Sequence, residues 1–191
     1  QQPASAVGAR SLYYREQLGA GFDNGMHRRF ANGTQPRYVS FRVRPGSSVS
    51  TTGCFSLEDG VYDSTRHHWN WEPIIDFKAI EGAKFDTNGN TGGDATVHYE
   101  PKQWHFIELR NIDWTAHKYD YWVNGSLIKA GIPFRPRSFT YSNQITRLHR
   151  YNSAGEGEAC WDEIRVLDHD EVWMSAATST LTLAPGASST I

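Results

Sequence analysis

The chain has 191 residues, and its 19 Lys and Arg against 21 Asp and Glu give a net charge of -2. Because both signs are spread along the sequence, this balance excludes the basic stripe of a nucleic-acid binder and the basic amphipathic helix of a membrane-surface protein, and no apolar run is long enough for membrane insertion. A chain of this length suits one large all-β domain.

Short stretches with alternating apolar and polar side chains follow one another, separated by Gly, Asn, Ser and Pro. In 37–45 (RYVSFRVRP), for example, Val39, Phe41 and Val43 share one face. A period of two is typical of half-buried strands, and no helical period extends beyond about two turns. We therefore predict an antiparallel two-sheet sandwich with strands at 10–18, 37–45, 53–59, 74–80, 95–99, 104–109, 119–123, 126–129, 144–151 and 158–167.

The strongest of these patterns is a hairpin at 104–125 (WHFIELRNIDWTAHKYDYWVNG). Its second strand ends in Asn124-Gly125, a pair that supplies the positive-φ turn joining one strand to the next, here at 126–129. We expect this hairpin to lie at the centre of the sandwich. Two prolines interrupt 132–137, so that segment cannot form a central strand.

Residues 60–73 (GVYDSTRHHWNWEP) are predicted to form a long loop that carries His68, Trp69 and Trp71. Long loops in compact domains are commonly functional. In an extended segment Trp69 and Trp71 project to one side, so both indoles can stack on sugar rings, with His68 on the other side. The alternative is a loop that folds back and buries both indoles under the sheet edge.

The two cysteines, Cys54 and Cys160, each lie on an expected strand, and neither belongs to a CxxC pair. Two interpretations stand. The first is a disulfide between neighbouring strands, worth about 3–5 kcal/mol in the chain-entropy model. The second is a pair of buried thiols that pack as small hydrophobic side chains.

Polar groups with possible chemistry lie on the last two strands. Arg147, His149 and Tyr151 alternate along 144–151 and so share a face, where they can bind a ligand, or neutralise a uronate and abstract its proton. A plain polar strand face explains the three residues more simply than catalysis does. In 158–167, Cys160, Asp162, Ile164 and Val166 are expected to share a face, and a partly buried carboxylate such as Asp162 requires a cation or several donors. No Ser-His-Asp order, zinc spacing or phosphate loop is present.

Five segments, RYVSFRVRP, GCFSLEDG, WHFIELRNIDW with YDYWVNG, ITRLHRYN and ACWDEIRV, resemble the concanavalin-A-like (laminin-G-like) jelly-roll modules of secreted bacterial multidomain proteins. The resemblance covers about 12–168. It implies an all-β, two-sheet antiparallel jelly-roll sandwich over 1–174. The tail 175–191 (SAATSTLTLAPGASSTI) is then a linker or the start of a following immunoglobulin-like module, since LTLAPGASSTI resembles the opening of such modules in bacterial surface proteins.

Members of this family often hold one structural Ca²⁺ between an acidic residue near the amino end and the Asp of the closing strand. The matching positions are Asp23 in GFDNG and Asp162 in CWDEI. A Gly-containing turn would add the carbonyl oxygens that calcium favours. The alternative is that Asp162 accepts backbone N–H groups or pairs with an arginine.

The resemblance is specific for fold and much less so for function, because this fold serves lectins, adhesion modules, glycosidases and polysaccharide lyases. We expect a non-catalytic, extracellular or cell-surface module that binds carbohydrate or a surface glycan, or serves adhesion, beside the flanking domains of a longer chain. The expected ligand residues are Trp69, Trp71, His68, Arg147, His149 and Tyr151. The runner-up is a polysaccharide-active enzyme, a uronate lyase or glycoside hydrolase, and a structural spacer is the third reading.

Overall fold

The computed structural model describes residues 11–15, 25–46, 52–63, 68–80, 82–87, 95–135, 142–151 and 158–168. Every regular element within these ranges is a β-strand, and they contain no helix that could span a membrane. The strands are β1 (Leu12–Arg15), β2 (Met26–Thr34), β3 (Tyr38–Pro45), β4 (Thr52–Asp63), β5 (His68–Ile80), β6 (Lys84–Thr87), β7 (Val97–His98), β8 (His105–Asp113), β9 (Lys118–Val123), β10 (Ser126–Pro133), β11 (Ile145–Tyr151) and β12 (Glu158–Leu167).

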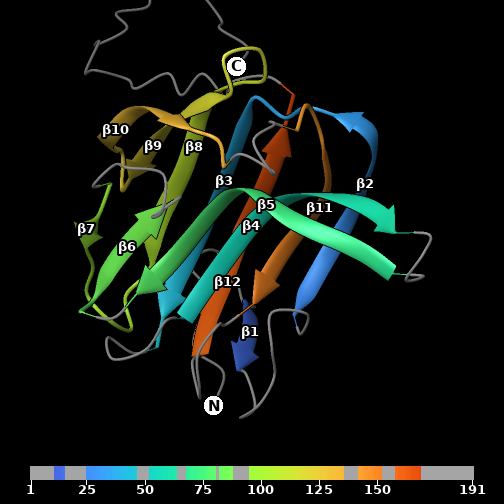
Figure 1. Cartoon of the computed structure of the whole chain (residues 1–191). Coiled ribbons are helices and arrows are strands. Elements are labelled where there is room, and N and C mark those ends of the chain that lie inside the picture. The colour runs from blue at the N-terminus through green and yellow to red at the C-terminus, as the bar shows by residue number, and fades with distance from the viewer. Residues whose placement is uncertain are drawn as a thin grey trace, which may run out of the picture.

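The strands form two antiparallel sheets that pack face to face (Figure 1). Sheet A has the order β1-β12-β3-β8-β9-β10, and sheet B has the order β2-β11-β4-β5-β6-β7. Some neighbours in each sheet come from distant parts of the sequence, as where β12 lies between β1 and β3. The predicted all-β, two-sheet antiparallel jelly-roll sandwich is confirmed.

The hairpin expected at 104–125 is formed by β8 and β9 in sheet A. Ile107 and Leu109 face the core, while Glu108 alternates with them on the outward face. Asn124 and Gly125 have φ values of 50° and 79°, which is the turn that Asn-Gly predicts. β10 follows at the edge of the sheet and ends at Pro133, where a missing N–H breaks no central ladder.

Aromatic side chains from both sheets meet in the centre of the sandwich. The Phe41 ring lies 4.3 Å from Phe55, 5.2 Å from Phe77 and 5.4 Å from Trp161, measured between ring centroids. All four side chains are almost completely buried. Burial of each is worth about 1.5–3 kcal/mol, so this cluster, built from the alternating residues of β3, β4, β5 and β12, holds the two sheets together.

The predicted loop at 60–73 is wrong. The backbone continues as paired strands, with Gly60 opposite Trp71 and Tyr62 opposite Trp69, up to the pair Asp63 and His68. The aromatic and β-branched residues of this segment favour extended, paired backbone. β4 and β5 therefore make a long hairpin that projects from the side of the sandwich (Figure 1).

The predicted single face for Cys160, Asp162, Ile164 and Val166 is also wrong. A bulge between Asp162 and Arg165 interrupts the pairing of β12 with β3, and Glu163 has a φ of 46°. An extra residue reverses the alternation. Cys160 and Asp162 consequently lie opposite Arg44 and Arg42 on the outward face, whereas Ile164 and Val166 pack against the core.

Candidate functional site

The outward face of sheet B carries a buried charged cluster. Glu58 of β4 accepts hydrogen bonds from Arg147 Nε and from Ser56 Oγ, the latter at 2.5 Å, and its Oε1 lies 3.2 Å from His149 Nδ1. The register explains the contact, because Arg147 pairs with Glu58 and His149 pairs with Ser56 across neighbouring strands. Glu58 is fully buried, and His149 and Arg147 are 1% and 5% exposed.

The structure thus brings together two predicted ligand residues, Arg147 and His149, around a carboxylate that the sequence analysis did not single out. Glu58 occupies donors of both side chains. An ionised arginine that is already paired, and an imidazole that is almost completely buried, are poorly available to a substrate. The arrangement supports a structural role for the cluster more than proton transfer.

Further charges lie near this cluster on the same face. His27 and Arg29 of β2 pair with His149 and Arg147. Burial, followed by the positive charges of Arg147 and Arg29 and by His149, lowers the pKa of His27 below its ordinary value. On β5, Asp76 Oδ2 lies 2.8 Å from Lys78 Nζ and 3.0 Å from Arg135 Nη1.

For the remaining predicted ligand residues the structure gives only backbone positions. Tyr151 pairs with Cys54, so it continues the alternation of Arg147 and His149. Gly60 and Tyr62 are the next two alternate positions after Glu58 on β4, and they pair with Trp71 and Trp69 of β5. The backbone positions of the two tryptophans therefore belong to the outward face. The side chains of His68, Trp69, Trp71 and Tyr151 lie outside the described part, so their role in binding stays a prediction.

The predicted calcium pair is half described. Asp23 lies outside the described residues. Asp162 is partly buried, and its Oδ1 accepts the N–H of Glu163 at 2.9 Å. Within the described ranges, no group of three or more His, Cys, Asp or Glu side chains could hold a metal ion. The calcium site therefore remains a proposal that depends on residues beyond these ranges.

The expectation that Cys54 and Cys160 lie on neighbouring strands is wrong. β4 and β12 belong to opposite sheets, and pairing with Tyr151 and Arg44 places the cysteines on the two outward faces, with the core between them. Stacked sheets lie about 10 Å apart, and a disulfide needs Cα atoms within about 7 Å. The two sulfurs are not joined, and both thiols are buried, which raises the pKa of Cys160.

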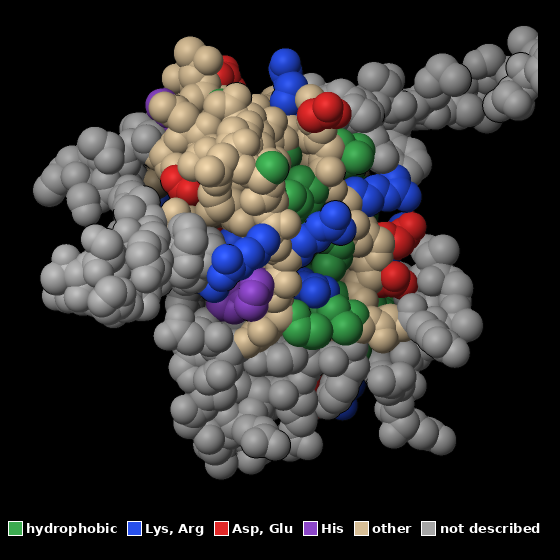
Figure 2. Space-filling model, turned by 90° about the vertical axis from the view of Figure 1, so that its right-hand side faces the viewer, with side chains coloured by type: hydrophobic (Ala, Val, Ile, Leu, Met, Phe, Trp, Pro, Cys, Tyr) green, Lys and Arg blue, Asp and Glu red, His purple; other side chains and the backbone are tan. Residues whose placement is uncertain are grey.

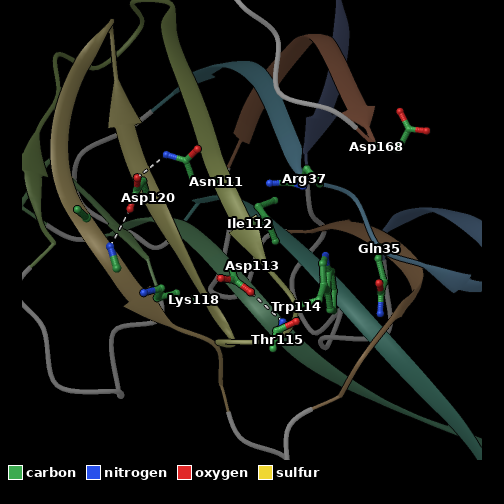
Figure 3. A pocket seen from close by; sticks show the side chains of 12 residues that line it. Gln35, Arg37, Asn111, Ile112, Asp113, Trp114, Thr115, Lys118, Asp120 and Asp168 are labelled. Carbon is green, nitrogen blue, oxygen red and sulfur yellow. Dashed lines mark hydrogen bonds between the residues drawn. The ribbon is translucent and has the colours of Figure 1, made fainter.

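An open polar groove of about 780 Å³ lies at one end of sheet A (Figure 3). Its carboxylates are Asp113, Asp120 and Asp168. Its cations are Arg37, just before β3, and Lys118, at the start of β9. We call this the polar groove. Its volume lies in the range of small-molecule sites, and side chains of both signs converge on it.

Two bulges fix the carboxylate at the centre of the polar groove. On one side of Asp120, β8 bulges near Asn111, whose φ is 52°, and on the other side β10 bulges near Gly131, whose φ is 66°. These bends aim Asn111 Nδ2 and the Gly131 N–H at the two oxygens of Asp120, at 2.7 and 2.8 Å. Bulges commonly reorient side chains at functional sites.

The second carboxylate is held by a turn. Asp113 Oδ1 accepts the backbone N–H groups of Thr115 and Ala116 at 2.9 and 2.8 Å. These hydrogen bonds, that from Ala116 first, lower the pKa of Asp113 below its ordinary value. Trp114 lines the groove and is anchored through its indole N–H to the carbonyl of Pro36 at 2.8 Å. The groove therefore presents two carboxylate acceptors, Asp113 and Asp120, whose positions are fixed by hydrogen bonds.

The sequence analysis missed the polar groove entirely. Its residues come from the segments 35–37, 111–120, 130–131 and 168, and only the sheet order makes them neighbours. Glu58, by contrast, had a local signal. It lies two residues after Ser56 in a predicted strand, so the two side chains were expected on the same face of the sheet.

No protein-family model matches the sequence, and no curated protein is similar to it. Among solved structures, the chain is similar to an endo-β-1,4-glucuronan lyase from the fungus Trichoderma reesei, with a TM-score of 0.55 and 11% identity over 85% of this chain and 83% of the lyase. At this identity the likeness concerns the fold alone.

Two further solved structures are similar at lower scores. A galectin from Caenorhabditis elegans has a TM-score of 0.42 and 12% identity, over 79% of this chain and 96% of the galectin. A SAP-like pentraxin from Limulus polyphemus has a TM-score of 0.46 and 15% identity, over 85% of this chain and 78% of the pentraxin.

Proposed function

We propose that this chain is a non-catalytic carbohydrate-binding module and that its saccharide occupies the polar groove. The observation that carries the proposal is the pair of anchored carboxylates, Asp113 and Asp120, in an open groove beside Lys118 and Arg37. A sugar hydroxyl donates to a carboxylate and accepts from a cation, so a groove with both kinds of group, held in place, suits a polyhydroxylated ligand.

The lowered pKa of Asp113 favours a role for this residue in binding over a role as a catalytic acid. Glycoside hydrolysis generally needs one carboxyl group that stays protonated, with a raised pKa, beside one that is ionised. The pKa of Asp113 is instead lowered by two backbone N–H donors. Asp113 is therefore an acceptor of hydrogen bonds rather than a proton donor to a leaving group.

The proposal includes the setting expected from the sequence. A glycan ligand, an extracellular or cell-surface location and flanking domains in a longer chain fit a module that binds and does not cleave. The fold itself does not choose between binding and cleavage, because sandwiches of this kind serve lectins as well as lyases. The lining of the polar groove supports the choice.

The second candidate is a polysaccharide-cleaving enzyme that uses the outward face of sheet B. One observation favours it, since Arg147, His149 and the position of Tyr151 share this face and lie across the strands from Ser56 and Glu58. The geometry of Glu58 weakens it, because this carboxylate already accepts hydrogen bonds from the arginine and the histidine.

A glycan array probed with the full chain would identify the ligand, and affinity for that glycan would then be measured on three variants. Asp120→Asn should weaken binding about tenfold or more, because a hydrogen bond to a charged group is worth roughly 1.5–3 kcal/mol. The matched control, Glu100→Gln, removes an exposed carboxylate outside the groove and should leave the affinity unchanged.

Trp69→Ala distinguishes the polar groove from the surface predicted on sheet B. If the groove holds the sugar, this substitution leaves the glycan affinity unchanged. A loss of affinity in Trp69→Ala with none in Asp120→Asn would move the site to sheet B. An absorbance increase from unsaturated products on a uronate polymer would contradict the non-catalytic assignment.

A further inference from the structure

Two arginines occupy positions where the strand pattern calls for core residues. In the β2–β11 pair, His27 and Arg29 face outward with His149 and Arg147. The alternate positions point between the sheets, and there Arg28 pairs with Leu148, while Arg150 pairs with Met26. A sandwich edge of this kind normally closes with apolar side chains on both sheets.

The result is a slot of about 420 Å³ between the two sheets at the β2 edge. We call it the arginine slot. It is lined by Arg28, Phe30, Leu148 and Arg150 of sheet B and by Ile164 and Val166 of β12. Figure 2 faces this side of the molecule and shows arginine or lysine side chains lying among hydrophobic ones in the middle of the face.

Arg150 is the unusual member of the arginine slot. Its Nε is buried and has no hydrogen-bond partner. Burial lowers its pKa, and among the described residues no acidic side chain acts in the opposite sense. In the described part of the chain, neither Arg28 nor Arg150 has an ion pair, although Arg28 lies 5.9 Å from the ring centroid of Phe30. A largely buried cation without an anion is unfavourable, and a bound anion would relieve it.

We propose that the arginine slot binds an amphipathic anion, a carboxylate carried on an apolar alkyl chain. The carboxylate would take the guanidinium donors of Arg150 and Arg28, the geometry that arginine and carboxylate groups favour. The alkyl chain would lie against Leu148, Ile164 and Val166. A second groove of about 500 Å³ shares Phe30 and Val166 with the slot and extends the apolar path along β2. The arginine slot itself shares no lining residue with the polar groove, whereas the second groove shares Gln35 and Asp168 with it.

The proposal is tested by calorimetric titration of the full chain with octanoate at neutral pH, where the acid is ionised. The comparison ligands are octanamide, which keeps the chain and removes the charge, and acetate, which keeps the charge and removes the chain. Octanoate should bind with one site per chain, and both comparison ligands should bind at least tenfold more weakly.

Substitution then assigns the site. Arg150→Met should weaken octanoate binding at least tenfold while the melting temperature stays the same or rises, because an unpaired buried cation is lost. Arg28→Met should weaken binding to a smaller extent, since Arg28 is exposed. The matched control is Arg165→Met. Arg165 lies between Ile164 and Val166 in β12, but it is opposite Ser40 on the outward face of sheet A and forms an ion pair with Glu163. It should leave the affinity unchanged.

Three outcomes overturn the proposal. One is the absence of octanoate binding at millimolar concentration, and another is binding that Arg165→Met weakens as much as Arg150→Met does. The third is self-association that Arg150→Met abolishes in sedimentation, which would assign the slot to a second copy of the chain. If Arg150→Met fails to fold, Arg150→Lys and Arg28→Met carry the test, since lysine keeps the charge and should retain part of the affinity.

Discussion

Arg147 and Arg150 lie on the same strand, β11, and are both largely buried, yet their surroundings differ in kind. Arg147 points outward from sheet B and pairs with the fully buried carboxylate of Glu58. Arg150 points between the sheets into the arginine slot, where the described residues place no carboxylate beside it. Odd and even positions along a strand face opposite ways, so a separation of three residues places them in unrelated environments.

The comparison separates a structural charge from one open to a ligand. A buried pair such as Glu58 and Arg147 satisfies itself, and its removal exposes the cost of the partner left behind. A buried cation without a partner carries a desolvation cost that a bound anion would offset. The predictions below test this distinction, from the largest expected effect to the smallest.

Glu58→Gln should lower the free energy of unfolding by about 3–5 kcal/mol, because it leaves Arg147 as an uncompensated buried charge. Chemical denaturation monitored by tryptophan fluorescence measures this change. Arg147→Met should cost a similar amount, and the double variant should cost less than the sum of the two, because neither charge then remains alone.

A cost below about 1 kcal/mol for Glu58→Gln would break the comparison, since it would mean that water reaches the cluster and screens it. Arg150→Met serves as the contrast on the same strand. It should leave the free energy of unfolding unchanged or raise it.

Asp162 extends the comparison to a partly buried carboxylate on sheet A. If Asp162 and Asp23 hold Ca²⁺, removal of calcium with a chelator should lower the melting temperature, because an ion bound only by the folded state stabilises that state. The stabilisation is about 2.7 kcal/mol when the free calcium concentration is about a hundred times the dissociation constant. Differential scanning calorimetry with and without added Ca²⁺ measures the shift. An unchanged melt together with no bound metal by elemental analysis would remove the calcium proposal.

The smallest effect concerns His27, which lies next to the Glu58 cluster and is mostly exposed. Its pKa is lowered in the folded state by burial and by Arg147, His149 and Arg29. The unfolded chain therefore binds a proton more readily, so stability should fall as the pH drops through the ordinary histidine pKa near 6.5. His27→Gln should flatten this dependence in denaturation curves taken between about pH 5 and pH 8, the range in which histidine changes its charge. A slope that is unchanged in His27→Gln would assign it to another group.

Much of the fold was predictable because strand signals are local. The alternation of Val39, Phe41 and Val43, and the turn at Asn124 and Gly125, both recur in the structure as predicted. One error arose where a single extra residue changes the register. The bulge before Arg165 reversed the expected face of Ile164, and such an insertion has no reliable signal in a single sequence.

The candidate sites were less predictable than the fold. Arg147 and His149 were found by alternation, but their burial around Glu58 depends on which strand lies next to β11. The residues of the polar groove come from four separate segments and share no motif. The arginine slot could not be recognised from the sequence, because nothing in the sequence shows that Arg28 and Arg150 face the opposite sheet.

The sequence by itself determined the class of structure, through the two-residue period, the turn residues and the aromatic core positions, since these depend on neighbours along the chain. Only the tertiary structure decided which charges meet. Sheet order placed β4 beside β11 and so gave Arg147 its carboxylate, while the packing of β12 across from β2 enclosed Arg150 without one. Electrostatic energy depends on distance through space and on burial, and both are set by contacts between segments far apart in the sequence.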